Sequence, residues 1–195
     1  NKDQSYMLYS LTQWELSRLL LPLGGLTKEE TRTLAEEHGF VNARKRDSQD
    51  ICFVPDGDYA GFIRRWTGKE FSPGDFVGTQ GEVYGAHKGL IHYTVGQRKG
   101  LGLSFPQPMF VKELDVENNQ VVLAKAEELF SREVVARDIN LIAADSLEKP
   151  WRVKARIRYR QQEQPATVVQ TGPDELHVTF DQPQRAVTPG QALVL

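Results

Sequence analysis

The sequence predicts a mainly β protein with an N-terminal α-helical segment, in which a small central β domain is followed by a C-terminal antiparallel β-barrel. Two helix capping boxes lie within the first forty residues, and two series of short strand-like segments bounded by Gly, Pro and Asn follow them. We therefore expect three parts, at residues 1–60, 61–128 and 129–195.

The N-terminal part contains two helix starts, each a Thr followed by Glu three residues later: Thr12–Glu15 and Thr27–Glu30. We expect the first helix to run to Leu21, before Pro22, and the second to end at His38–Gly39. Two short helices bury too little apolar surface to be stable alone, so we expect them to belong to a larger domain that begins before Asn1.

The strands of the central part are predicted from alternating or β-branched residues between turn signals. They are Asp75–Thr79, Glu82–Ala86, Ile91–Val95, Phe110–Val116 and Gln120–Ala124. An acidic connector around Glu127–Glu133 is expected to lead to the last part. Its strands are predicted at Asp138–Ala143, Trp151–Arg160, Ala166–Gln170, Glu175–Phe180 and Ala192–Leu195.

The segment from Trp151 to Arg160 alternates without interruption between apolar and basic residues. A strand of period two would place all five cations on one face: Arg152, Lys154, Arg156, Arg158 and Arg160. Such a row of like charges is stable where water, carboxylates or a polyanion compensates it. A phosphate backbone and a solvated sheet face are both consistent with it.

The basic charge is local. The chain has 24 Lys and Arg against 26 Asp and Glu, for a net charge of -2, yet residues 149–163 hold six basic residues and one acidic residue. This contrast favours a directed binding face over general attraction to nucleic acid. The composition is too apolar for a disordered chain, and the sequence has neither a signal peptide nor an apolar run of roughly 20 residues. We expect a cytoplasmic protein with no membrane partner.

Cys52 is the single cysteine, which excludes an internal disulfide and a zinc site of several thiolates. The four histidines show no metal-ligand spacing, so we expect no structural metal. Between Ile51 and Phe53, Cys52 reads as a small buried side chain. A reactive thiolate would require the cations at 44–46 to lie close to it in space.

A loop at Gly96–Gly102 presents Arg98 and Lys99 among three glycines. It lacks the Lys-Ser or Lys-Thr ending of an ATP-binding P-loop. A basic turn at an RNA surface and a solvated hairpin loop both remain open.

Five motifs, taken in order, resemble the tRNA-specific 2-thiouridylases across essentially the whole chain. They are KDQSYMLY, SQDICFVPDGDY, GLIHYTVGQRKGLGL, YRQ and PQRAVTPGQALVL. The resemblance implies that the C2 oxygen of the wobble uridine of tRNA, at position 34, is activated with ATP and replaced by sulfur from a cysteine persulfide. It also implies that Cys52 is the catalytic persulfide carrier.

The resemblance further implies tRNA contacts at the first motif and near the end of the chain: Lys2, Asp3, Gln4, Arg158, Tyr159 and Gln191. To these RNA-binding residues the charge pattern adds Arg156, Arg98 and Lys99. Tyr159 falls on the apolar side of the predicted strand. It is therefore either a core residue that meets RNA through its edge or backbone, or the strand ends before it.

The family's ATP-pyrophosphatase domain and its second catalytic cysteine have no counterpart in this sequence. We therefore expect residues 1–60 to be the end of the nucleotide-binding domain, ATP to bind outside this chain, and the chain alone to be inactive. The implied partners are tRNA and a protein that donates persulfide sulfur. The alternative is a non-catalytic RNA-binding β-barrel module, resembling domains of translation factors, in which Cys52 is inert.

Overall fold

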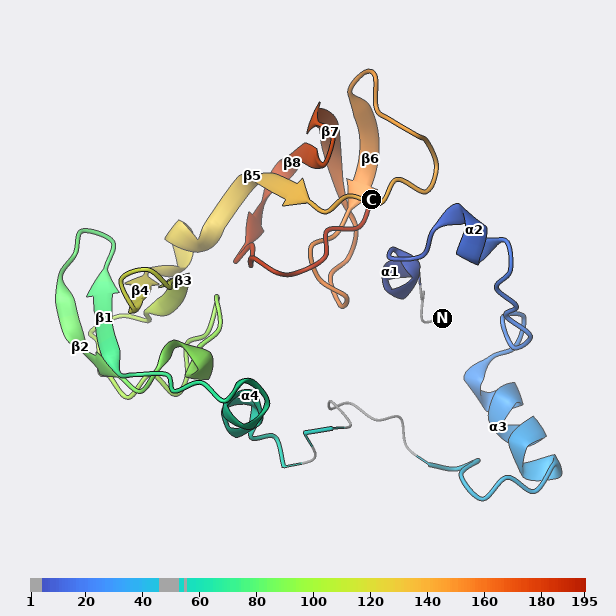
Figure 1. Cartoon of the computed structure of the whole chain (residues 1–195), viewed down its shortest axis with the longest axis horizontal. Helices are drawn as coiled ribbons and strands as arrows, with labels where there is room; N and C mark the ends of the chain where they lie inside the picture. The colour runs from blue at the N-terminus through green and yellow to red at the C-terminus, as the bar shows by residue number, and fades with distance from the viewer. Residues whose placement is uncertain (1–4, 46–52, 55) are drawn as a thin grey trace. The chain divides into compact units, whose positions relative to one another are not determined.

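The computed structural model describes residues 5–45, 53–54 and 56–195. The chain divides into two compact units, Asn1–Asp58 and Tyr59–Leu195. The first contains helices, and the second contains two four-stranded sheets (Figure 1). The expected class, mainly β with helices at the N-terminus, is confirmed.

The described residues of the first unit form three short helices: α1 (Ser5–Leu8), α2 (Gln13–Leu16) and α3 (Lys28–Glu37). Both predicted capping boxes are confirmed, because Thr12 and Thr27 each accept from the backbone N–H of the Glu three residues later. The predicted extension of the first helix to Leu21 is wrong, since α2 ends at Leu16. No residue of α2 or α3 is buried.

The second unit begins with α4 (Tyr59–Thr67), which the sequence analysis missed. Its first sheet contains β1 (Gly74–Gly78), β2 (Val83–His87), β3 (Phe110–Asp115) and β4 (Gln120–Ala124), in the order β2-β1-β4-β3. The two predicted hairpins form antiparallel pairs. They join through a parallel pairing of β1 with β4, which local turn signals do not reveal.

The second sheet contains β5 (Phe130–Arg137), β6 (Trp151–Ala155), β7 (Gln164–Gly172) and β8 (Glu175–Arg185), all antiparallel in the order β5-β8-β7-β6. Instead of the strand predicted at 192–195, a single bridge joins Val194 to Arg156. The pairings among the described residues do not close this sheet into a ring.

Three other segment predictions are wrong. Residues 91–95 are not a strand: Ile91 and His92 belong to the 3-10 helix η1 (Leu90–His92), and Tyr93, which follows it, is part of the first core. The acidic connector at 127–133 is instead the 3-10 helix η2 (Ala126–Leu129) and the start of β5. A register shift between Ser131 and Glu133 interrupts the alternation there, so this strand did not show in the sequence pattern.

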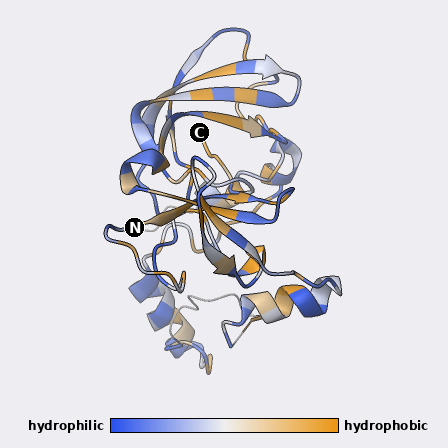
Figure 2. Ribbon diagram, turned by 90° about the vertical axis from the view of Figure 1, so that its left-hand side faces the viewer, coloured by the Kyte–Doolittle hydropathy of each residue, from blue (hydrophilic) through white to orange (hydrophobic). Residues whose placement is uncertain are grey.

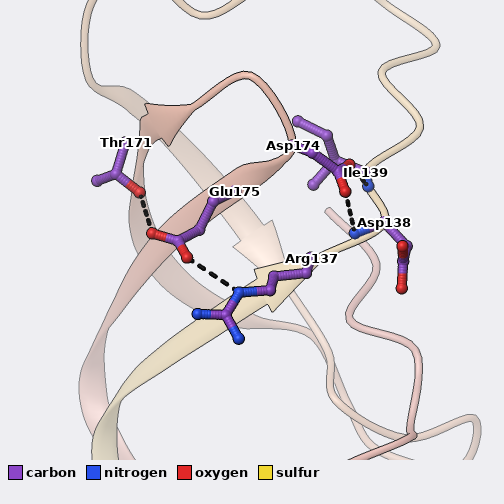
Figure 3. Close-up of polar contacts among 6 residues, drawn as sticks. All are labelled: Arg137, Asp138, Ile139, Thr171, Asp174 and Glu175. Carbon is purple, nitrogen blue, oxygen red and sulfur yellow. Dashed lines mark hydrogen bonds and ion pairs between the residues drawn. The ribbon is translucent and has the colours of Figure 1, made fainter.

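The strand predicted at 138–143 is also wrong, because β5 ends at Arg137. Asp138 adopts a left-handed backbone (φ 57°). The Asp174 carboxylate, in the β7–β8 turn, accepts from the backbone N–H of Asp138 at 3.2 Å and of Ile139 at 2.8 Å (Figure 3). These donors are therefore unavailable to a sheet.

Each sheet has its own core. Within the described ranges, the core of the first sheet contains four fully buried residues: Phe76, Val111, Val121 and Leu123. Within the same ranges, the core of the second sheet contains five: Ala155, Ala166, Val168, Val178 and Phe180. Hydrophobic and hydrophilic residues follow one another along the strands in Figure 2. This is the pattern of sheets with one face in a core.

Candidate nucleic-acid interface

Six of the predicted site residues lie in the described part of the second unit: Arg98, Lys99, Arg156, Arg158, Tyr159 and Gln191. The predicted nucleophile Cys52, and Lys2, Asp3 and Gln4 of the first motif, lie outside the described residues. The structure therefore shows the surroundings of predicted RNA-binding residues and not those of the predicted nucleophile.

The cationic segment is a strand only in its first half. β6 ends at Ala155, Arg156 makes a single bridge, and residues 157–160 form a bend and a turn. The prediction that all five cations share one strand face is therefore wrong. Of the two interpretations for Tyr159, the strand ends before it, and its side chain is 38% exposed.

Arg152, the first cation of the segment, is compensated within the sheet. Its guanidinium donates to both carboxylate oxygens of Asp181, at 2.8 and 2.7 Å, and to the hydroxyl of Thr167 at 2.9 Å. The hydrogen bonds and charge of Arg152 lower the pKa of Asp181. This charge is therefore balanced by a carboxylate on β8, which β7 separates from β6 in the sheet.

Arg156 is only 8% exposed, and its backbone exchanges hydrogen bonds with Val194 at 2.9 and 3.0 Å. It lines a hollow of about 280 Å³, whose other lining residues are Lys154, Gln161, Gln162 and Glu163. Gln161 is held in place by two hydrogen bonds: its side-chain carbonyl accepts from the Ile157 N–H at 3.0 Å, and its side-chain amide donates to the side-chain carbonyl of Gln184 at 2.6 Å. The most buried cation of the segment is thus one of the residues that line a polar hollow.

Arg158 is half-buried and holds the segment that follows β8. Its Nη2 donates to the Ala186 carbonyl at 2.6 Å and to the Thr188 hydroxyl at 3.0 Å. Ala186 is buried in a left-handed conformation (φ 55°), which is costly for a residue with a side chain. The Ala186 N–H donates to the Leu129 carbonyl at 2.8 Å, so contacts from two sides hold this conformation.

Gln191 is exposed at the end of the turn that starts at Thr188. Its N–H donates to the Thr188 carbonyl at 3.3 Å, and Gly190 takes the left-handed position of the turn (φ 80°). Since Thr188 also accepts from Arg158, the structure brings these two predicted contacts into one local cluster.

The Gly96–Gly102 loop lies against the same segment. Gly96 donates to the Val111 carbonyl at 2.7 Å, and Val111 donates to the Gln97 carbonyl at 2.9 Å, so the loop is anchored to β3. A Cβ on Gly96 would lie 3.1 Å from the Cβ of Ala186. The exposed Arg98 and Lys99 therefore follow directly after a contact with the segment that Arg158 holds.

Arg185 is the residue of this region that the sequence analysis missed. It is exposed at the end of β8, and its guanidinium lies 5.0 Å from the centroid of the Phe110 ring, on β3. Its place in the PQRAVTPG motif was the only available signal, because isolated arginines are common on surfaces.

Three family models match successive parts of the chain. Residues 1–56 match the tRNA methyl transferase HUP domain, residues 60–125 the tRNA methyl transferase PRC-barrel domain, and residues 131–195 the aminomethyltransferase beta-barrel domain. The tRNA-specific 2-thiouridylase MnmA of Acetivibrio thermocellus is 52% identical over 99% of this chain. The proteins of the same name from Clostridioides difficile and Carboxydothermus hydrogenoformans are 47% and 49% identical, over 100% and 99% of the chain.

This chain belongs to the tRNA-specific 2-thiouridylase family. The resemblance seen in the five motifs is thereby confirmed. The chain spans about half the length of the curated 2-thiouridylases that it matches, namely 54%, 54% and 53% of these three. The names of the family models mention methyl transfer, whereas these full-length relatives are named for thiolation.

The described residues contain no group of three or more His, Cys, Asp or Glu side chains placed to hold a metal ion. None of the helices in the described ranges is long and apolar enough for a membrane span.

Proposed function

We propose that the protein carrying this chain is a tRNA sulfurtransferase that forms 2-thiouridine at the wobble position. The observation that supports this most is 47–52% identity, over essentially the whole chain, to proteins named tRNA-specific 2-thiouridylase. In this proposal the chain supplies the sulfur-carrying cysteine and the tRNA-binding surface.

We assign sulfur transfer to Cys52. As a thiolate it attacks the outer sulfur of a persulfide on the donor protein, whose S–S bond breaks and whose cysteine leaves as a thiolate, so that Cys52 becomes the persulfide. The outer sulfur of Cys52 then attacks C2 of the activated uridine. The C2 oxygen leaves with the activating AMP group. A second thiol must then break the persulfide and form a disulfide, and Cys52 is the single cysteine of this sequence. We therefore expect the chain alone to complete no turnover.

ATP is a substrate of the proposed reaction, and we assign its binding to the ATP-pyrophosphatase domain of the family. The glycine loop at 96–102 is a poor fit, because it has no Lys-Ser or Lys-Thr ending and its backbone is paired with β3. No step of activation is assigned to the described residues.

The proposed domain organisation places the end of the nucleotide-binding domain at 1–60, the central β domain at 61–128 and the tRNA-binding barrel domain at 129–195. The ranges of the three family models support it, as does the division of the chain at Asp58–Tyr59.

We assign tRNA binding to nine residues: Lys2, Asp3, Gln4, Arg98, Lys99, Arg156, Arg158, Tyr159 and Gln191. For the six described ones, the support is their position on the second unit, where Arg158, the Gln191 turn and the basic loop meet around Ala186. Cationic side chains would contact phosphates, and these contacts position the RNA without reading its bases.

The experiment is to replace the thiouridylase of a bacterial host by the protein that carries this chain and to analyse the nucleosides of its tRNA by mass spectrometry. We expect 2-thiouridine derivatives to be restored. Methylated uridine without thiolation would favour the activity in the names of the family models. No change in the nucleosides, with tRNA binding retained, would favour the non-catalytic RNA-binding module.

A further inference from the structure

The cations of the second unit differ in how they are compensated. Arg152 is paired with Asp181 and Arg137 with Glu175, while Arg158 is bound to a carbonyl and a hydroxyl. Arg98, Lys99 and Arg185 are among the cations of this unit that make no ion pair with any residue in the ranges 5–45, 53–54 and 56–195. These three lie in the same region.

Arg185 is held in place by its backbone and by a ring. It pairs in register with Phe130 of β5, and the next residue, Ala186, donates to the Leu129 carbonyl. Its guanidinium stays near the ring of Phe110, with 5.0 Å from Cζ to the ring centroid. This contact orders the side chain and leaves the planar group able to donate hydrogen bonds to an anion.

The basic loop lies beside this guanidinium. A Cβ on Gly96 would be 3.7 Å from Nη1 of Arg185, and Arg98 and Lys99 follow within three residues. The side chain of Gln97 donates to the Lys99 carbonyl at 2.9 Å, which fixes the turn that carries both cations. The loop that carries Arg98 and Lys99 therefore passes beside Arg185, and no carboxylate of the described residues is paired with any of these three cations.

We propose that Arg185 contacts a tRNA phosphate and that it forms, with Arg98 and Lys99, a single phosphate-binding surface across the two sheets. The proposal rests on the tRNA-binding function proposed above. Neighbouring like charges repel one another, and a polyanionic backbone relieves that repulsion for several of them at once. Arg158 supports this surface from within, because it binds the carbonyl of the residue next to Arg185.

The test is tRNA affinity at several salt concentrations for the protein that carries this chain, comparing wild type with Arg185→Gln, Arg185→Lys and Arg137→Gln. Loss of one phosphate contact should make the slope of log affinity against log salt shallower by about 0.7 to 0.9 in Arg185→Gln. Arg185→Lys keeps the charge and should retain the slope, with a weaker affinity because the planar group is lost. Arg137→Gln removes an exposed cation that is already paired with Glu175, so it should leave the slope unchanged.

A slope in Arg185→Gln equal to that of wild type, with tRNA still bound, would overturn the Arg185 proposal and leave tRNA binding intact. A wild-type protein that binds no tRNA would instead overturn the proposed function. Melting temperatures of all variants identify any effect that comes from unfolding. If Arg185→Gln fails to fold, Arg185→Lys still tests the proposal, because unchanged affinity in that variant would contradict a role for the guanidinium.

Discussion

Gly74, at the start of β1, lies where the surrounding atoms leave no room for a Cβ. A Cβ there would collide with the carbonyl of Asn119 and lie 2.8 Å from Nε2 of His87. His87 is 2% exposed, and its ring contacts two turns. Its Nε2 lies 3.0 Å from the carbonyl of Asn119, in the β3–β4 turn, and its Nδ1 accepts a hydrogen bond from the N–H of Gly89, which follows β2.

We predict that Gly74→Ala destabilises the second unit by about 1–3 kcal/mol, because a backbone carbonyl and a buried ring must shift to make room. Chemical denaturation measures it. Gly172→Ala is the matched control, because its nearest neighbour would be the Cβ of Glu175 at 3.6 Å, an ordinary contact. Equal stability of the two variants would contradict the close approach at Gly74.

Residues of the candidate site were predictable only in part. Arg98, Lys99 and Arg158 stand out by charge or motif, and the structure brings them to one region. What the sequence pattern could not predict is that Arg158 binds a backbone carbonyl and that Arg185 lies over Phe110. Both depend on chain segments far apart in the sequence.

At the scale of elements, the end of β5 is fixed by the turn between β7 and β8. Glu175 accepts from the Thr171 hydroxyl at 2.9 Å and from Arg137 at 3.1 Å (Figure 3). The hydrogen bond from Thr171, followed by that from Arg137, lowers the pKa of Glu175 below its ordinary value of 4.5.

Because this pKa is lower in the folded state, ionised Glu175 stabilises the fold above pH 4.5, and that contribution is lost as the pH falls through the folded-state value. We predict that Glu175→Gln melts below wild type at neutral pH and that the gap closes in acid. Thermal melts across pH check it, with the exposed Glu117→Gln as control. A gap that is constant with pH would show that the charge of Glu175 is not responsible.

The elements that sequence predicted well are those determined by neighbouring residues. The capping boxes at Thr12 and Thr27, and the hairpins around Gly81 and Asn119, need only a few residues in the right order. β5 was missed because a bulge breaks its alternation, and the parallel β1–β4 pairing depends on contacts between distant segments. The second half of the cationic segment alternates like a strand, but a bend and a turn replace the strand after Arg156.

At the scale of the whole molecule, the two units differ in how much they bury. α2 and α3 have no buried residues, and Trp14 is 65% exposed, whereas Val168, Val178 and Phe180 are almost completely buried in the second unit. A helix without a packed apolar face opens easily.

We therefore predict that, in this 195-residue chain, the amides of α2 and α3 exchange hydrogen much faster than those of β7 and β8. Hydrogen exchange followed by mass spectrometry measures it. Protection of the α3 amides as strong as that of the β8 amides would contradict this prediction, because it would mean that the helices of the first unit are stable without further packing.

The central claim is a division of labour, in which Cys52 carries sulfur and the second unit binds tRNA. The most direct measurement is Cys52→Ser in the protein that carries this chain, with thiouridine content and tRNA affinity determined on the same preparation. The change removes the sulfur-accepting atom and little volume, so we predict that 2-thiouridine formation is abolished while tRNA affinity stays near wild type. Thiolation near the wild-type level in Cys52→Ser would contradict the account.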